Sequence, residues 1–190
     1  YPYLFGNKPS IGDFGMIAPL YGHLGRDPVP LSLMQINAPR LFRWVERMNR
    51  SEPDIGEFAD KSTNYLANDE IPETLIDVLK HFATDFIPES VAAYNCVSHW
   101  LEANKDLPAG TVAEREVGSC AFEIDGIEIN AVAQPFRFYL LHRLQKEFDS
   151  LSEADRSDVR QLLKDCHMDE VLNLRLSRKI GRANNLEVWV

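Results

Sequence analysis

Apolar residues recur at helical spacing near the start of the chain. Ser10 and Asp13 stand three residues apart just before this pattern, and their hydroxyl and carboxylate can satisfy the free N–H groups of a helix start. We therefore predict that a helix begins there, with Ser10 and Asp13 as its structural cap and a kink at Pro19. Its apolar positions are Phe14, Ile17, Leu20, Tyr21 and Leu24.

Prolines divide the helical pattern that follows. Residues 25–28 are expected to end the first helix, and residues 31–37 can form a short second one. Pro39 suits the first turn of the next helix, because the N–H group that proline lacks has no partner there. By the same argument, Pro72 and Pro88 are each predicted to begin a separate helix.

The only strong strand signal in the sequence lies at 120–131. Asp125-Gly126 is a favoured two-residue turn. It pairs Ile124 with Ile127, Glu123 with Glu128, and Phe122 with Ile129. This register places the four apolar side chains on one face, and we expect the facing glutamates to be exposed, since like charges repel.

Two further helices are predicted after the hairpin. The first runs from Pro135, and its expected inward face is Phe136, Leu140, Leu141, Leu144, Phe148 and Leu151. The second begins at Ser152, where the Ser-x-x-Asp pattern recurs, and Cys166 completes its apolar face. The tail from residue 174 carries basic residues and then an extended stretch.

Together these patterns predict a mostly α fold, a helical bundle with one β-hairpin at about 120–131. Residues 51–70 lack a clear period, and residues 51–110 carry 3 basic and 12 acidic groups. We therefore expect 1–50 to be one helical part, 51–70 an acidic connection, and 71–190 a helical extension with the hairpin.

Composition places the 190-residue chain among globular proteins, with 45% hydrophobic and 26% charged residues. Its net charge of −9 disfavours nucleic acid as a partner. No apolar run approaches the ~18 residues of a membrane span and no signal-peptide pattern is present, so no membrane partner is expected. Cys96, Cys120 and Cys166 are too widely spaced for a zinc or redox pair, which indicates reduced thiols and a cytoplasmic location.

Several residues have both a chemical and a structural interpretation, and the structural one is favoured. Asp13 could be an acid, but its spacing from Ser10 is that of a cap. Cys166 could be a reactive thiol, but it completes an apolar face. No metal site is expected, because no two histidines have the i, i+4 spacing of a helical ligand pair. The five histidines are His23, His81, His99, His142 and His167.

Two groups of residues leave alternatives open. The aromatic set Phe14, Tyr21, Phe42 and Trp44 could line a pocket for an apolar electrophile, although core packing is the favoured interpretation. The basic set Arg175, Arg178, Lys179 and Arg182 could hold a carboxylate or phosphate. A solvated helix end is favoured for this second set, and an anion-binding enzyme is the weaker alternative.

A family resemblance rests on three segments in order. They are Lys8-Pro9-Ser10-Ile11-Gly12-Asp13-Phe14-Gly15-Met16, Leu20-Tyr21, and Ala38-Pro39-Arg40-Leu41-Phe42-Arg43-Trp44-Val45-Glu46-Arg47-Met48. These segments resemble the later half of the helical C-terminal domain of glutathione S-transferases, in which a Ser-x-x-Asp cap precedes an Ala-Pro-x-x-x-x-Trp-x-x-Arg-Met segment. Residues 69–190 resemble more loosely a C-terminal extension of some bacterial members.

The resemblance implies a bundle of the glutathione S-transferase C-terminal-domain type. In that family a preceding thioredoxin-like domain holds the co-substrate glutathione and supplies the residue that activates its thiol. We therefore assign no catalytic, cofactor-binding or metal-binding residue to this chain. Because it begins at Tyr1 without an initiator methionine, we expect a fragment whose partner is that domain, with a homodimer as a candidate assembly.

The expected function follows from the separate roles of the two domains in that family. The chain would supply the apolar acceptor-substrate side of the site in the full-length transferase, and alone it would be inactive. The missing helices should leave an exposed apolar surface around Tyr1, Tyr3, Phe5, Phe14 and Tyr21. The alternative is a non-catalytic protein-interaction module derived from the same fold.

Overall fold

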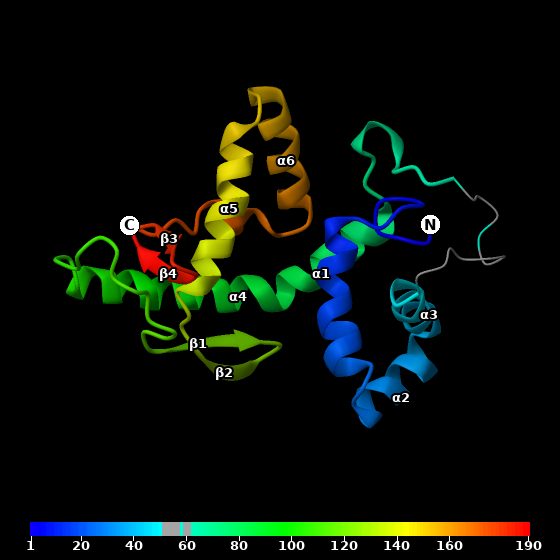
Figure 1. Ribbon diagram of the computed structural model, residues 1–190, viewed down its shortest axis with the longest axis horizontal. Coiled ribbons are helices and arrows are strands. Elements are labelled where there is room, and N and C mark those ends of the chain that lie inside the picture. Colours follow the sequence, from blue (N-terminus) through cyan, green and yellow to red (C-terminus); the bar gives the residue numbers. More distant parts are fainter. Residues whose placement is uncertain (51–57, 59–61) are drawn as a thin grey trace. The chain divides into compact units, whose positions relative to one another are not determined.

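The computed structural model describes residues 1–50, 58 and 62–190, and its regular structure is mostly helical with two small antiparallel strand pairs (Figure 1). The predicted mostly α class is therefore confirmed. Contacts divide the chain into two units, Tyr1–Leu75 and Ile76–Val190. Most of the expected acidic connection, residues 51–57 and 59–61, lies outside the described residues.

The helices of the first unit are short. They are α1 (Ile11–Pro19), α2 (Pro28–Asn37) and α3 (Pro39–Met48), and a single π-helical segment, η1 (Leu20–Leu24), follows α1 directly. The helix predicted from Ser10 therefore changes type after Pro19, where the Gly25 N–H donates to the Leu20 carbonyl at 2.7 Å.

The start of α2 differs from the prediction. The helix begins at Pro28 rather than at residue 31, because Asp27 has an extended backbone and both Pro28 and Pro30 fall in the first turn. Proline costs no helical hydrogen bond in that turn. The predicted start of α3 at Pro39 is confirmed.

Residues 62–70 lie in the first unit and are bonded to its N-terminal segment. The Asn7 N–H donates to the Asn64 carbonyl at 3.0 Å, and the Leu66 N–H donates to the Phe5 carbonyl at 2.9 Å. Gly6 has a φ of +119°, and a Cβ there would lie 3.0 Å from the Asn64 oxygen. Glycine is therefore required for this close approach of two backbones. A short 3-10 turn, η2 (Ala67–Asp69), follows.

One helix, α4 (Glu73–Ala103), spans the region where two were predicted. The prediction that Pro88 begins a separate helix was wrong, since this proline lies inside α4. Proline removes one backbone hydrogen bond, but the apolar face continues across it and packs on the core of the second unit. Tertiary packing has overridden the local signal. The buried positions of α4 are Ala83, Ser90, Ala93, Val97 and Leu101.

The predicted hairpin is confirmed in bounds and register. Strands β1 (Ser119–Ile124) and β2 (Ile127–Val132) pair Ile124 with Ile127, Glu123 with Glu128, and Phe122 with Ile129. Asp125 and Gly126 have φ values of +50° and +78°, as a type I′ turn requires. Both glutamates are exposed, as expected.

Helix α5 (Phe136–Ser150) forms as predicted, and Leu141 and Phe148 of its predicted inward face are buried. Its buried side chains are Phe138, Leu141, Gln145 and Phe148, whereas Phe136, Leu140 and Leu144 are exposed. Helix α6 (Glu153–Asp165) follows, and the predicted cap is present, with the Asp155 N–H donating to the Ser152 hydroxyl. A 3-10 turn, η3 (Asp169–Leu172), then leads to the tail.

The tail forms a second hairpin that the sequence analysis missed. Strands β3 (Ile180–Ala183) and β4 (Leu186–Trp189) are joined by Asn184 and Asn185, both at positive φ. β4 also bonds to the chain after α4: the Trp189 N–H donates to the Thr111 carbonyl and the Ala113 N–H to the Glu187 carbonyl, each at 2.8 Å. The end of the described chain is thus built into the second unit.

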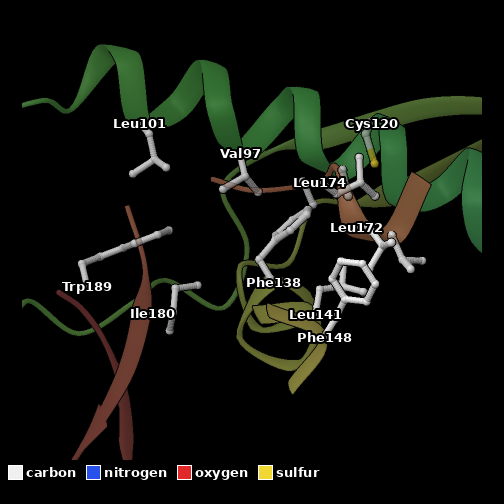
Figure 2. Close-up of a cluster of buried hydrophobic side chains, with 13 residues drawn as sticks. Val97, Leu101, Cys120, Phe138, Leu141, Phe148, Leu172, Leu174, Ile180 and Trp189 are labelled. Atoms are coloured by element: carbon white, nitrogen blue, oxygen red, sulfur yellow. The ribbon is translucent and has the colours of Figure 1, made fainter. Parts of the chain in front are cut away.

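A single hydrophobic cluster fills the second unit. Figure 2 shows side chains of α4, α5 and β4 pointing into a common interior. Trp189 is fully buried, and its ring stacks on Trp100 with centroids 5.7 Å apart. The cluster comprises Ala93, Val97, Leu101, Cys120, Ala133, Phe138, Leu141, Phe148, Val171, Leu172, Leu174, Ile180 and Trp189.

Candidate functional site

Asp13 joins several segments of the first unit by hydrogen bonds. Its carboxylate is fully buried and accepts hydrogen bonds from the Ser10 N–H (2.9 Å), the Ser10 hydroxyl (2.7 Å), the Leu4 N–H (3.1 Å) and the Trp44 indole N–H (3.2 Å). The predicted capping box is present. Asp13 therefore does more than cap α1, because it also ties the N-terminal segment and α3 to the same point.

A second buried charge lies in the same unit. Arg47, on α3, donates from Nη1 to the Pro2 carbonyl at 3.1 Å, and its guanidinium lies over the ring of Phe58, 4.9 Å from the centroid. Asp13 and Arg47 thus hold the N-terminal strand-like segment at two places. Both side chains satisfy backbone groups, which indicates a structural rather than a catalytic role.

Large apolar side chains of α1, η1 and α2 are exposed. Ile11 is 91% exposed, Phe14 60% and Ile36 73%. The core-packing interpretation is therefore wrong for Phe14 and Tyr21, while Phe42 and Trp44 are half-buried. Tyr1 is exposed as expected, but Tyr3 and Phe5 are half-buried. The whole exposed set on these helices is Ile11, Phe14, Tyr21, Leu24, Val29, Leu33 and Ile36.

The cysteines and histidines form no obvious reactive centre. The three cysteines are free, and Cys166 is fully buried as predicted. Burial raises the pKa of the Cys166 and Cys120 thiols, which makes them weak nucleophiles. Among the residues that the structure describes, no group of three or more His, Cys, Asp or Glu side chains could hold a metal ion.

The basic tail residues are brought into a cleft of the second unit. The cleft, with a volume of about 400 Å³, lies between α5 and the segment 174–180. Arg175, Arg178 and Lys179 line it, whereas Arg182 does not and pairs instead with Glu187 at 3.0 Å. Arg175 and Lys179 are exposed to solvent and Arg178 is half-buried, so the solvated interpretation holds for the first two, although all three lie in an irregular segment rather than at a helix end. Helix α5 adds His142, Lys146 and Asp149.

One ion pair orders the cleft wall. Arg175 donates from both Nη atoms to the two oxygens of Asp149, at 2.8 and 2.9 Å, and from Nε to the Leu172 carbonyl. The Arg175 guanidinium holds the pKa of the Asp149 carboxyl below its usual range. Asp149 is therefore occupied by Arg175, and the remaining cations of the cleft are not neutralised by it.

The pKa of His142 reflects the charges of this cleft. Burial lowers the pKa of its imidazole, and the positive charges of Lys179, Arg175 and Lys146 lower it further, against a weaker opposite effect of Asp149. The basic set predicted from the sequence covers only the tail side of this cleft. The helix side carried a signal, because His142, Lys146 and Asp149 are spaced four and three residues apart and so share one face of a helix.

Comparisons with known proteins add no relative to this picture. No family model matches the chain, and no curated protein or solved structure matches it either. In the described part of the chain, no helix has the length and apolar character needed to cross a membrane. The resemblance to glutathione S-transferases thus rests on sequence motifs.

Proposed function

We propose that residues 1–50 are the later part of the helical C-terminal domain of a glutathione S-transferase-like, cytoplasmic protein. In the full-length chain, this part would form the apolar acceptor-substrate side of the site. Glutathione would be the co-substrate, held by a thioredoxin-like domain. Two motif positions support the proposal, since the Ser-x-x-Asp cap begins α1 and the Ala-Pro dipeptide begins α3 at Pro39.

The observation that carries the proposal is an exposed apolar face on a fixed frame. Phe14 and Tyr21 are exposed on α1 and η1. The helix below them is fixed by the four hydrogen bonds to Asp13, one of which comes from Trp44 on α3. Apolar side chains held in a defined place are suited to bind an apolar electrophile beside a thiol.

The acceptor side can be tested in the chain that also carries the thioredoxin-like domain. Phe14→Ala and Tyr21→Ala should each raise the KM for an apolar acceptor such as chlorodinitrobenzene and leave the KM for glutathione unchanged. Ile127→Ala is the matched control, because Ile127 is also an exposed apolar residue but lies at the tip of the β1–β2 hairpin. Equal effects of all three changes would contradict the proposal.

The 190 residues alone provide a second test. Nothing in them is placed by motif to lower the pKa of a thiol or to hold the tripeptide backbone. Calorimetry should therefore find that glutathione binds with a Kd no lower than about millimolar. The rate of conjugation should not exceed the background rate. Micromolar binding by the isolated chain would contradict the assignment of glutathione to another domain.

The alternative function is a non-catalytic protein-interaction module. It is supported by the number of exposed apolar side chains, since Val29, Leu33 and Ile36 on α2 are exposed in addition to Phe14 and Tyr21. This surface would also suit a homodimer. Leu33→Lys tests α2 as a docking surface: it should abolish self-association, measured by light scattering, if α2 docks a second copy of the chain, and self-association unchanged by Leu33→Lys would contradict that use of α2.

A further inference from the structure

The cationic cleft of the second unit has the size and position of a ligand site. Its volume of about 400 Å³ lies within the range of small-molecule pockets. It is formed by two segments distant in the sequence, α5 and residues 174–180. The proposed transferase function does not use it, because every lining residue lies in the second unit.

The charge in the cleft is unbalanced. Lys146, Arg178 and Lys179 line it, and its one carboxylate, Asp149, is already paired with Arg175. Within the described part of the chain, the ammonium groups of Lys146 and Lys179 make no hydrogen bond or ion pair. Three cations gathered around one hollow repel one another, and a bound anion would relieve that repulsion. The arrangement is unexpected in a chain whose net charge is −9.

The wall of the cleft is held in place from behind. The buried Gln145 amide donates to the carbonyls of Val171 (2.7 Å) and Leu174 (3.2 Å), which fixes the start of the 174–180 segment against α5. The Arg178 guanidinium donates to the Leu107 carbonyl. The cations of this segment are therefore attached to a rigid support, which lowers the entropy cost of binding.

The cleft also has an apolar side. Phe138, Leu174 and Ile180 belong both to its lining and to the hydrophobic cluster (Figure 2), and each keeps 4–5% of its surface exposed. Leu176 adds to this side. A ligand that fills the cleft therefore needs an anionic group for the cations and an apolar body for this wall.

We propose that this cleft binds a phosphate monoester whose ester group is apolar. A monoester carries close to two negative charges at neutral pH and offers three acceptor oxygens, which matches three cations that approach from two segments. A monocarboxylate has one charge and two oxygens, so it would leave part of the positive charge of the cleft without a neutralising partner. Inorganic phosphate has the charge but cannot contact the apolar wall.

Calorimetry with the 190-residue chain tests the ligand class, using phenyl phosphate, inorganic phosphate and benzoate as probes. Phenyl phosphate should bind with a Kd below about 1 mM, and each of the other two should bind about tenfold or more weakly. Affinity should fall as salt is raised, because the recognition is electrostatic. Equal affinity for phenyl phosphate and inorganic phosphate would overturn the role of the apolar wall, and no binding of phenyl phosphate would overturn the site.

Variants test the location. Lys146→Gln and Lys179→Gln should each weaken phenyl phosphate binding about tenfold, which is the effect expected on losing a hydrogen bond to a charged group. Lys164→Gln is the matched control, because Lys164 is an exposed lysine of the same unit outside the cleft. If Lys164→Gln weakens binding as much as the other two, the anion responds to net charge and not to the cleft.

An NMR titration of His142 in the wild-type chain gives a readout that depends on no variant. The charged groups around His142 are Lys179, Arg175 and Lys146, which lower its pKa, and Asp149, which opposes them. A dianion bound among the cations should raise the pKa of His142, so phenyl phosphate should shift its titration to higher pH. An unchanged titration at saturating phenyl phosphate would place the ligand elsewhere and overturn the proposal.

Discussion

The two units of the chain are stabilised in different ways. In the described part of the first unit, the large buried apolar side chains are Met34 and Val45, and two charged side chains, Asp13 and Arg47, are also buried. The second unit buries a thirteen-residue apolar cluster. A unit that buries little apolar surface depends on directional hydrogen bonds to a few buried charges. We therefore expect the first unit to be sensitive to single polar changes and the second to changes in volume.

The largest expected effect tests the second unit. Trp189→Ala removes a fully buried ring that stacks on Trp100 and whose indole N–H donates to Glu114. The cavity should lower the free energy of unfolding by about 3–5 kcal/mol. Urea unfolding followed by circular dichroism measures the loss. Leu186→Ala, on the same strand but exposed, is the control, and a loss below about 1 kcal/mol for Trp189→Ala would contradict the role of the cluster.

The next effect tests the first unit. Asp13→Ala leaves four hydrogen-bond donors without their acceptor, so the first unit should lose about 3 kcal/mol, more than the ~1 kcal/mol of an ordinary helix cap. NMR spectra recorded at increasing urea concentration can follow the unfolding of the first unit from the Trp44 indole N–H signal. The Trp189 indole N–H signal reports the unfolding of the second unit.

Asp27→Ala is the matched control for Asp13. Asp27 precedes α2 but makes no side-chain capping bond. Asp27→Ala should therefore leave the urea midpoints of both indole N–H signals unchanged. If Asp13→Ala and Asp27→Ala have the same small effect, the buried carboxylate is not what stabilises the first unit.

A smaller effect is expected at the β1–β2 hairpin. Gly126 has a φ of +78°, which a β-branched residue resists, so Gly126→Val should cost about 1–3 kcal/mol. A Cβ at this position would meet no neighbouring atom, so the cost would come from the backbone alone. Hydrogen exchange of the β1 and β2 amides measures it. If Gly126→Val leaves the protection of these amides unchanged, the backbone strain is contradicted. Glu123→Lys should be neutral or slightly stabilising, because it removes the repulsion between Glu123 and Glu128.

The smallest effect concerns pH. Burial and nearby cations lower the pKa of His142 in the folded state, so the unfolded state takes up the proton first as the pH falls below the usual histidine value of about 6.5. Stability of the second unit should therefore decline from there down to the lowered pKa. Urea midpoints at several pH values should show this slope in wild type and a shallower one in His142→Gln, and Leu144→Gln should keep the wild-type slope.

Signals confined to a few residues were predictable from the sequence. The caps at Ser10 and Ser152 and the Asp125-Gly126 turn depend on neighbours within four residues, and all three are confirmed. The Asn184-Asn185 turn carried a similar signal, because asparagine tolerates positive φ, but it was overlooked.

Features that depend on distant segments were not predictable. Apolar residues surround much of α5, so spacing alone could not select Phe138 over Phe136 as the buried side chain. The buried Gln145 is satisfied by carbonyls 26 and 29 residues away. The cleft likewise needs α5 and the tail to meet, which no local pattern in either segment indicates.

The bonds between β4 and residues 111–113 have a consequence for the order in which the chain can fold. The ribosome releases residues from the N-terminus onward, and units generally fold as they emerge. The first unit has all its residues by Leu75, so it can form while synthesis continues. The core of the second unit lacks its largest side chain until Trp189 has left the ribosome. Until then, the apolar face of α4 remains exposed to solvent. During that interval, the exposed apolar face of α4 makes the second unit the part of the nascent chain that is prone to aggregate.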